Sequence, residues 1–238
     1  MDAMQKDYLN YDQIATQYNQ RYPNSQTWER GQALLELAKQ VKAKTILEVG
    51  SGTGFWLNLL NQTGGKLFGL DYSMGMLQQS KGQPAPLSLT RGSGTQLPYR
   101  SSSFDLLYCV DAIHHFGDHR AFITEASRLL KPGGALAIIG HDPHEGPSHW
   151  YIYNYFDHVY DTDLRRYPSG NRVLQWMEQE GLKNISDQTV ESIHNIHVGD
   201  AVLFPEKQFK DFTMPKIETV NHYNEFVDAV MGKGQTST

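Results

Sequence analysis

The chain has very little cysteine, because Cys109 is the only one among its 238 residues. A single cysteine excludes a disulfide within the chain and is typical of a protein from a reducing compartment. Since Cys109 lies inside an apolar segment, we expect it to be a small buried residue and not a nucleophile.

The sequence also lacks an excess of positive charge. Its 21 basic and 26 acidic residues give a formal net charge of −5, and no basic block appears, so nucleic acid is not an expected partner. Apolar runs such as Leu106 to Val110 are far too short to span a membrane. The first residues lack the basic region and apolar core of a signal peptide. These absences favour a cytoplasmic protein that binds neither nucleic acid nor a membrane.

The clearest feature that is present is the apolar segment Thr45 to Val49, which runs into Gly50-Ser51-Gly52-Thr53-Gly54. The short run of branched side chains predicts a central strand that is buried on both faces. Three glycines at alternate positions predict a sharp turn whose backbone N–H groups lie against a ligand, because glycine takes positive φ and has no Cβ. Glu48 is a carboxylate in this apolar strand, so it needs a cationic ligand or backbone donors as partners.

Two nucleotide-binding signatures are absent from this turn. A dinucleotide-binding turn follows G-x-G-x-x-G/A, but Phe55 stands at the third glycine position. The Gly-Lys-Ser/Thr sequence of a phosphate-binding loop is missing as well. Asp71 follows Gly54 by 17 residues, a distance that suits one helix and one strand. The sequence therefore predicts a βαβ unit with an acidic residue at the end of its second strand.

The pattern E-x-G-x-G-x-G from Glu48 to Gly54 resembles the first motif of the class I S-adenosylmethionine (SAM) dependent methyltransferases. Tyr11 to Tyr18 is similar to the Y-D-x-I-A-x-x-Y segment of the methyltransferases related to quinone biosynthesis. The segments L-P-x-x-x-x-x-F-D from Leu97 to Asp105 and L-x-P-G-G-x-L from Leu130 to Leu136 are two further similarities. The resemblance covers about residues 11–140.

The resemblance implies SAM as the cofactor, S-adenosylhomocysteine as its product and a small molecule as the methyl acceptor. It places the glycine turn beside the methionine end of SAM, Asp71 on the ribose and Ser93 to Gln96 near the adenine. The family usually has Gly-Asp-Ala before the L-P segment, and Gly92-Ser93-Gly94 lacks that acid. The expected cofactor-binding residues are Tyr11, Tyr18, Glu48, Gly50, Ser51, Gly52, Thr53, Gly54, Asp71, Tyr72, Ser73, Met76, Ser93, Gly94, Thr95, Gln96, Val110 and His115.

Alternating strand and helix patterns predict one domain over residues 1–238, with a doubly wound, mostly parallel α/β sheet of the Rossmann-like methyltransferase fold and an α-helical cap. We expect helices over 27–42 and 54–61, after Ser73, from Phe122 to Leu130, and around Val173 to Met177. We expect strands over 45–49, 66–71, 84–89, 104–110 and 135–139, and an antiparallel edge strand over 190–198.

Three further segments are assigned to the cap. Residues 1–27 are expected to form a lid over the cofactor, although an amphipathic helix that docks Ile14 and Tyr18 on the core is an equal alternative. The aromatic-rich segment 141–168 is expected to be a helical insertion in which Tyr155 and Tyr160 shape the acceptor site, and its alternative is an ordinary satellite core. Residues 200–238 are expected to be helical and part of the cap.

The catalytic candidates are His115 and His141, because a base is needed only if the acceptor must lose a proton and histidine suits that task near neutral pH. No metal is expected. The competing metal interpretation would use His114, His115, His141, Asp142, His144 and His149, but the H-E-x-x-H spacing is absent. Two other functions remain open: a non-catalytic SAM-binding regulatory protein and an NAD(P)-dependent oxidoreductase.

Overall fold

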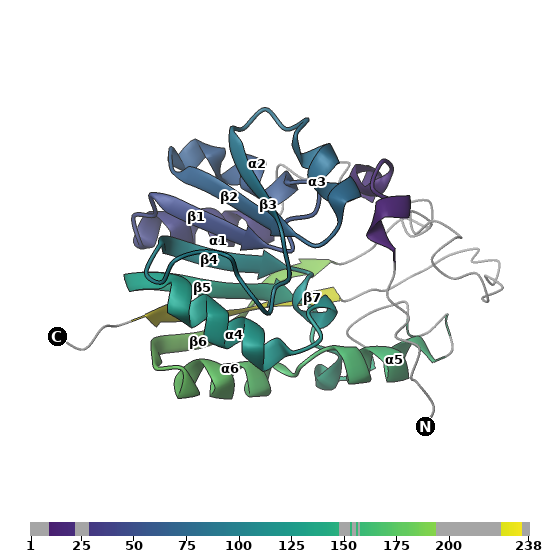
Figure 1. The fold of residues 1–238 in the computed structure, drawn as a ribbon. Coiled ribbons are helices and arrows are strands. Elements are labelled where there is room, and N and C mark those ends of the chain that lie inside the picture. The colour runs from purple at the N-terminus through teal and green to yellow at the C-terminus, as the bar shows by residue number, and fades with distance from the viewer. Residues whose placement is uncertain are drawn as a thin grey trace, which may run out of the picture.

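The computed structural model describes residues 10–21, 29–147, 153, 156, 158–193 and 225–234. Seven strands in these ranges form one sheet in the order β3-β2-β1-β4-β5-β7-β6, which Figure 1 shows with helices on both faces. The strands are β1 (Thr45–Val49), β2 (Lys66–Asp71), β3 (Leu87–Arg91), β4 (Phe104–Val110), β5 (Leu130–Gly140), β6 (Leu182–Ile193) and β7 (Glu225–Gly234).

The helices pack on the sheet or extend beyond its end. The α-helices are α1 (Glu29–Gln40), α2 (Phe55–Leu60), α3 (Met74–Ser80), α4 (His119–Leu129), α5 (Val159–Arg166) and α6 (Gly170–Gln179). Short 3-10 helices lie at Tyr11–Gln13, Tyr18–Arg21, Asn61–Thr63, Ile113–His115 and Pro143–Glu145. The N-terminal 3-10 helices, in purple, and α5 lie at the end of the sheet to which the arrowheads of β4 and β5 point (Figure 1).

The sheet is doubly wound, as predicted. Strands β1 to β5 pair in parallel, and β7 pairs antiparallel with both β5 and β6. From β1 the chain builds outward to β2 and β3, then returns to β4 on the other side of β1. Ligands bind in open α/β sheets beyond the carboxyl ends of the strands at such a reversal. The topology therefore predicts a site above β1 and β4.

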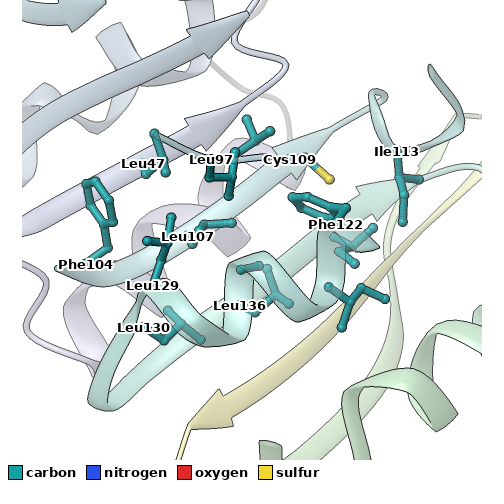
Figure 2. Packing of buried hydrophobic residues seen from close by; sticks show 14 of the residues in the cluster. Leu47, Leu97, Phe104, Leu107, Cys109, Ile113, Phe122, Leu129, Leu130 and Leu136 are labelled. Carbon is teal, nitrogen blue, oxygen red and sulfur yellow. The ribbon is translucent and has the colours of Figure 1, made fainter. Parts of the chain in front are cut away.

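The core lies on both faces of the central strands, because successive residues of a strand point to opposite faces. In β1, Ile46 packs in a cluster with residues of α1 and α2, whereas Leu47 and Val49 pack in a second cluster with residues of α4 and α6. All three side chains are fully buried. Figure 2 shows part of the second cluster, in which Phe122 and Leu129 of α4 meet Leu47 and other side chains of the sheet. Cys109 is fully buried in this cluster, as expected.

Helix α4 ends one residue earlier than predicted, and β5 begins five residues earlier, at Leu130 instead of residue 135. Helix α4 ends at Leu129, and Leu130 is extended with φ −68° and ψ 135°. Pro132 has no backbone N–H, and its ring restricts the residue before it to extended conformations. As a result β5 begins at Leu130 and runs through Lys131-Pro132-Gly133-Gly134, which the sequence pattern had assigned to a turn.

The prediction of a helical C-terminal segment is wrong for residues 225–234. These residues form β7, which lies between β5 and β6. The prediction of an antiparallel edge strand is confirmed, but β6 covers Leu182–Ile193 and not residues 190–198. Both errors have one cause: β7 exists because it pairs with strands far away in the sequence, and a local pattern does not reveal that pairing. Residues 194–224 lie outside the described residues.

Candidate functional site

A cavity of about 590 Å³ lies at the carboxyl ends of β1, β2 and β4, where the strand order reverses. Its volume is within the range of small-molecule pockets. The predicted residues that line it are Tyr11, Tyr18, Glu48, Gly50, Ser51, Gly52, Thr53, Asp71, Tyr72, Ser73, Met76, Ser93, Gly94, Val110 and His115. The remaining lining residues are Asn10, Asp12, Phe55, Trp56, Leu70, Arg91, Gly92, Asp111, Ala112 and Phe116.

The glycine turn after β1 forms the floor of this cavity. Gly50, Gly52 and Gly54 have φ values of +75°, +52° and +73°, a region that favours glycine. Among the atoms of the described residues, a Cβ atom added to Gly52 would come within 4.0 Å of only one, on the ring of Tyr18. The Ser51 hydroxyl is buried and has no hydrogen-bond partner within the part of the chain that the structure describes. The turn therefore offers open space beside Gly52, which suits a close-lying ligand.

Asp71 at the end of β2 is tied to the glycine turn. One carboxylate oxygen accepts a hydrogen bond from the Gly52 N–H at 2.7 Å, and the other accepts one from the Ser73 N–H at 2.8 Å. Burial raises the pKa of this carboxyl, although the N–H groups of Ser73 and Gly52 oppose the shift. Each oxygen keeps a second lone pair for a ligand hydroxyl.

Glu48 is the buried carboxyl that the sequence singled out. It is 1% exposed, and the Tyr108 hydroxyl donates a hydrogen bond to it at 3.2 Å. Burial raises the pKa of Glu48 well above its usual value, and the charge of nearby Asp71 raises it further. Two carboxyls on one wall make the cavity attractive to a cationic group.

The N-terminal segment is fixed to the cavity rim at three points. The Tyr11 hydroxyl lies 2.6 Å from Nε2 of His115. Asp12 accepts hydrogen bonds from the Ser73 hydroxyl at 2.5 Å and from the Gly75 N–H at 2.7 Å, so its charge lies at the N-terminus of α3. The Thr53 hydroxyl donates to the side chain of Asn19. These contacts hold residues 10–19 against the residues that line the cavity.

Asp111 is a wall residue that the motif comparison did not select. Its carboxylate forms an ion pair with Arg30 at 2.9 Å, and the Arg30 side chain is 5% exposed. A buried guanidinium is costly without such a partner. The sequence contains a signal for this pair, because Arg30 lies one helical turn before Leu34, on the buried stripe of α1. A charged residue on a buried stripe indicates a specific partner.

The two catalytic candidates occupy different places. His115 lines the cavity, and its ring lies 3.9 Å from that of His114, which in turn stacks on Tyr167. His141 is not among the lining residues. Its Nε2 lies 3.0 Å from the Tyr153 hydroxyl, which donates to buried Asp163. A catalytic role for either histidine stays a prediction.

Three predicted cofactor residues do not line the cavity. Gly54 precedes α2, and a Cβ atom there would meet Leu87 at 2.8 Å. Thr95 and Gln96 face a separate depression beside α4. Gly94 does line the cavity and lies against the ring of Phe116, a wall residue that the sequence reasoning missed. The part of the cavity that was predicted to hold the adenine therefore combines Ser93 and Gly94 with an aromatic ring from the loop after β4.

The metal interpretation gains no support from the described ranges, where no three His, Cys, Asp or Glu side chains could together hold a metal ion. His149 lies outside those ranges, as does Tyr155. A search of the same ranges finds no helix that is both long and apolar enough to cross a membrane.

The fold and cavity define a Rossmann-like cofactor-binding protein, and comparisons with known proteins narrow this class. Residues 47–138 match the family described as "Methyltransferase domain". Demethylmenaquinone methyltransferase of Corynebacterium kroppenstedtii is 32% identical over 93 residues, which are 39% of this chain and 40% of that protein. The enzyme of the same name from Renibacterium salmoninarum is 23% identical over 197 residues, which are 74% of this chain and 83% of that protein.

A solved structure agrees in fold. Haemonchus contortus phosphoethanolamine N-methyltransferase 2, in complex with SAM, has a TM-score of 0.64 and 17% identity, and the match covers 94% of this chain and 57% of that one. These matches support the class I SAM-dependent methyltransferase family that the motifs predicted, with SAM as its cofactor.

Proposed function

We propose that this chain binds SAM in the 590 Å³ cavity and transfers its methyl group to a small-molecule acceptor. The main observation behind this proposal is that Glu48, the glycine turn and Asp71 lie together at the cavity. The Gly52 N–H connects the turn to Asp71 by a hydrogen bond of 2.7 Å. This arrangement places two buried carboxyls and the backbone of the glycine turn on one wall. The wall suits a ligand with a cationic end and ribose hydroxyls.

Each part of the wall has a proposed role. Glu48 and the turn from Gly50 to Thr53 hold the methionine end, and Asp71 accepts hydrogen bonds from the ribose. Tyr72 and Met76 lie along the nucleoside, while Ser93 and Gly94 contact the adenine. The N-terminal segment, through Tyr11 and Tyr18, covers the bound cofactor as a lid.

The chemistry requires little beyond alignment. SAM supplies an electrophilic methyl group on a sulfonium, so displacement needs an acceptor atom in line with the S–CH₃ bond and a site that excludes water. The cavity wall and the N-terminal segment position the reactants. Asp111 and His115 are the lining residues placed to accept a proton if the acceptor carries one.

Gly52→Ala tests the position of the ligand. Because a Cβ atom there would come near only Tyr18 at 4.0 Å, the substitution should cost about 1–2 kcal/mol of stability from positive φ alone. The added methyl group would occupy the space proposed for SAM, so we expect SAM binding to weaken by about tenfold. Calorimetric titration beside a thermal melt separates the two effects. Unchanged affinity would place the cofactor elsewhere.

Glu48 predicts a pH effect. Because folding raises its pKa, its contribution to stability is greatest below the usual pKa and is lost as the pH rises through the raised value. A cationic ligand favours the carboxylate, so SAM binding should release up to about one proton at pH values between the usual and the raised pKa of Glu48. Titrations in two buffers with different heats of ionisation measure this release. Glu48→Gln should abolish it, and proton uptake by the wild type would contradict the assignment.

The acceptor is proposed to be an aromatic or apolar small molecule, because Phe55 and Trp56 contribute to the cavity wall. Curated relatives named for demethylmenaquinone support a quinone-like ring. Incubation of the protein with methyl-labelled SAM and a panel of phenols, quinols and amines tests the proposal. Transfer of label to an aromatic acceptor is the expected result. SAM binding without turnover on any acceptor would favour a non-catalytic SAM-binding protein.

A further inference from the structure

His115 has hydrogen-bond neighbours on both ring nitrogens. Nδ1 lies 3.3 Å from Nη2 of Arg166, and Nε2 lies 2.6 Å from the Tyr11 hydroxyl. Three distant segments meet here: Arg166 is the last residue of α5, His115 follows β4, and Tyr11 belongs to the N-terminal segment. These two hydrogen bonds connect α5 to the N-terminal segment across the rim of the cavity.

The chemistry of the donors fixes the direction of these bonds. A guanidinium has only donors, so Nδ1 of His115 must accept the hydrogen bond from Arg166 and carry no proton. The proton of the neutral imidazole then resides on Nε2. Nε2–H donates to the Tyr11 oxygen, so the proton of the Tyr11 hydroxyl points away from His115.

We infer that Arg166 is a positioning residue: it fixes the Nε2–H tautomer of His115 and thereby orients the Tyr11 hydroxyl as a donor toward the ligand in the cavity. This inference rests on the proposed function, because it assigns the hydroxyl to the cofactor and acceptor site. It also changes the role of His115. Both of its ring nitrogens are engaged, so it orients Tyr11 and does not act as the base.

Arg166 is itself held in place. Its Nη1 lies 3.7 Å from Asp163, whose side chain is 5% exposed, while the Arg166 side chain is 42% exposed. Tyr153 donates to the same carboxyl at 3.2 Å. Arg166 therefore bridges a buried acid and the histidine, and its partial exposure makes substitution compatible with folding.

The tautomer is measured directly by long-range ¹H–¹⁵N correlation spectroscopy of the ¹⁵N-labelled, ligand-free protein at neutral pH. We expect His115 to carry its proton on Nε2. In Arg166→Met the ratio of the Nε2–H to the Nδ1–H form should fall by about threefold to tenfold, a reduced effect because the arginine is partly exposed. Arg166→Lys keeps a donor and should restore part of the ratio.

Two control variants sharpen the test. Arg165→Met removes the neighbouring arginine, whose Nη2 donates to Thr162 at 3.2 Å, and should leave the tautomer unchanged. Tyr11→Phe should also leave it unchanged, because Arg166 and not Tyr11 sets it. An Nδ1–H form or an imidazolium in the wild type, or an unaltered ratio in Arg166→Met, would overturn the inference.

A second measurement separates this inference from the proposed function. If Arg166 acts through Tyr11, Arg166→Met and Tyr11→Phe should weaken SAM or acceptor binding by similar factors. The double variant should then lose little more affinity than either single variant. Independent, additive losses would contradict action through Tyr11. The tautomer is read without SAM, so a protein that failed to bind SAM would refute the proposed function while leaving the tautomer result intact.

Discussion

Asp71→Ala is expected to weaken SAM binding by about 10- to 150-fold, the effect of losing about 1.5–3 kcal/mol from a hydrogen bond to a charged group. The carboxylate has two roles in the structure. It accepts the N–H groups of Gly52 and Ser73 at 2.7 and 2.8 Å, and it is proposed to accept the ribose hydroxyls. Calorimetric titration of the variant with SAM measures the loss.

Asp105→Ala is a matched control for this substitution. Asp105 also accepts two backbone N–H groups, those of Lys44 at 3.0 Å and Thr45 at 2.8 Å, but it lies near the start of β4, at the opposite end of that strand from the cavity. Asp105→Ala should lower stability and leave SAM affinity unchanged. If Asp71→Ala bound SAM as tightly as the wild type, the proposed ribose contact would be wrong.

Gly50→Ala is expected to lower the free energy of unfolding by about 2–5 kcal/mol, the largest stability effect that we predict. Gly50 has φ +75°, and a Cβ atom there would lie 2.5 Å from Cβ of Ala112. The cost therefore combines strain in the left-handed region with a collision between the glycine turn and the loop after β4. Denaturant unfolding of the ligand-free protein measures it.

Gly64→Ala separates these two contributions. Gly64 has a similar φ of +71°, but a Cβ atom there would meet no atom of the described residues within 4 Å, so only the strain of about 1–2 kcal/mol is expected. The double variant Gly50→Ala/Ala112→Gly should recover much of the stability that Gly50→Ala loses beyond the loss in Gly64→Ala. The reason is that Ala112→Gly removes the colliding methyl group. Equal losses for Gly50→Ala and Gly64→Ala would show that the two loops are not packed as described.

The sequence predicted the parallel half of the fold well because its signals are local. The apolar run at Ile46 to Val49, the glycines that follow and the Ser73 cap each lie within one element or one turn, and Ser73 does accept the Met76 N–H. The antiparallel half was predicted less well. Strand β7 pairs with β5 from about ninety residues away, and no local pattern encodes that partnership.

The same division applies to the candidate site. The glycine turn and Asp71 were predicted because both belong to one βαβ unit with a characteristic spacing. The pairs Arg30–Asp111, Asp12–Gly75 and Arg166–His115 were not, because each joins residues more than fifty positions apart. Such contacts arise only when the strand ends and the N-terminal segment converge at one edge of the sheet.

The most direct test of the central claim is a calorimetric titration of the purified protein with SAM, with S-adenosylhomocysteine and with NADH. The cavity residues predict micromolar binding of SAM and S-adenosylhomocysteine and no measurable binding of NADH. Binding of NADH alone would contradict the assignment of the glycine turn to SAM, and with it the proposed methyl transfer.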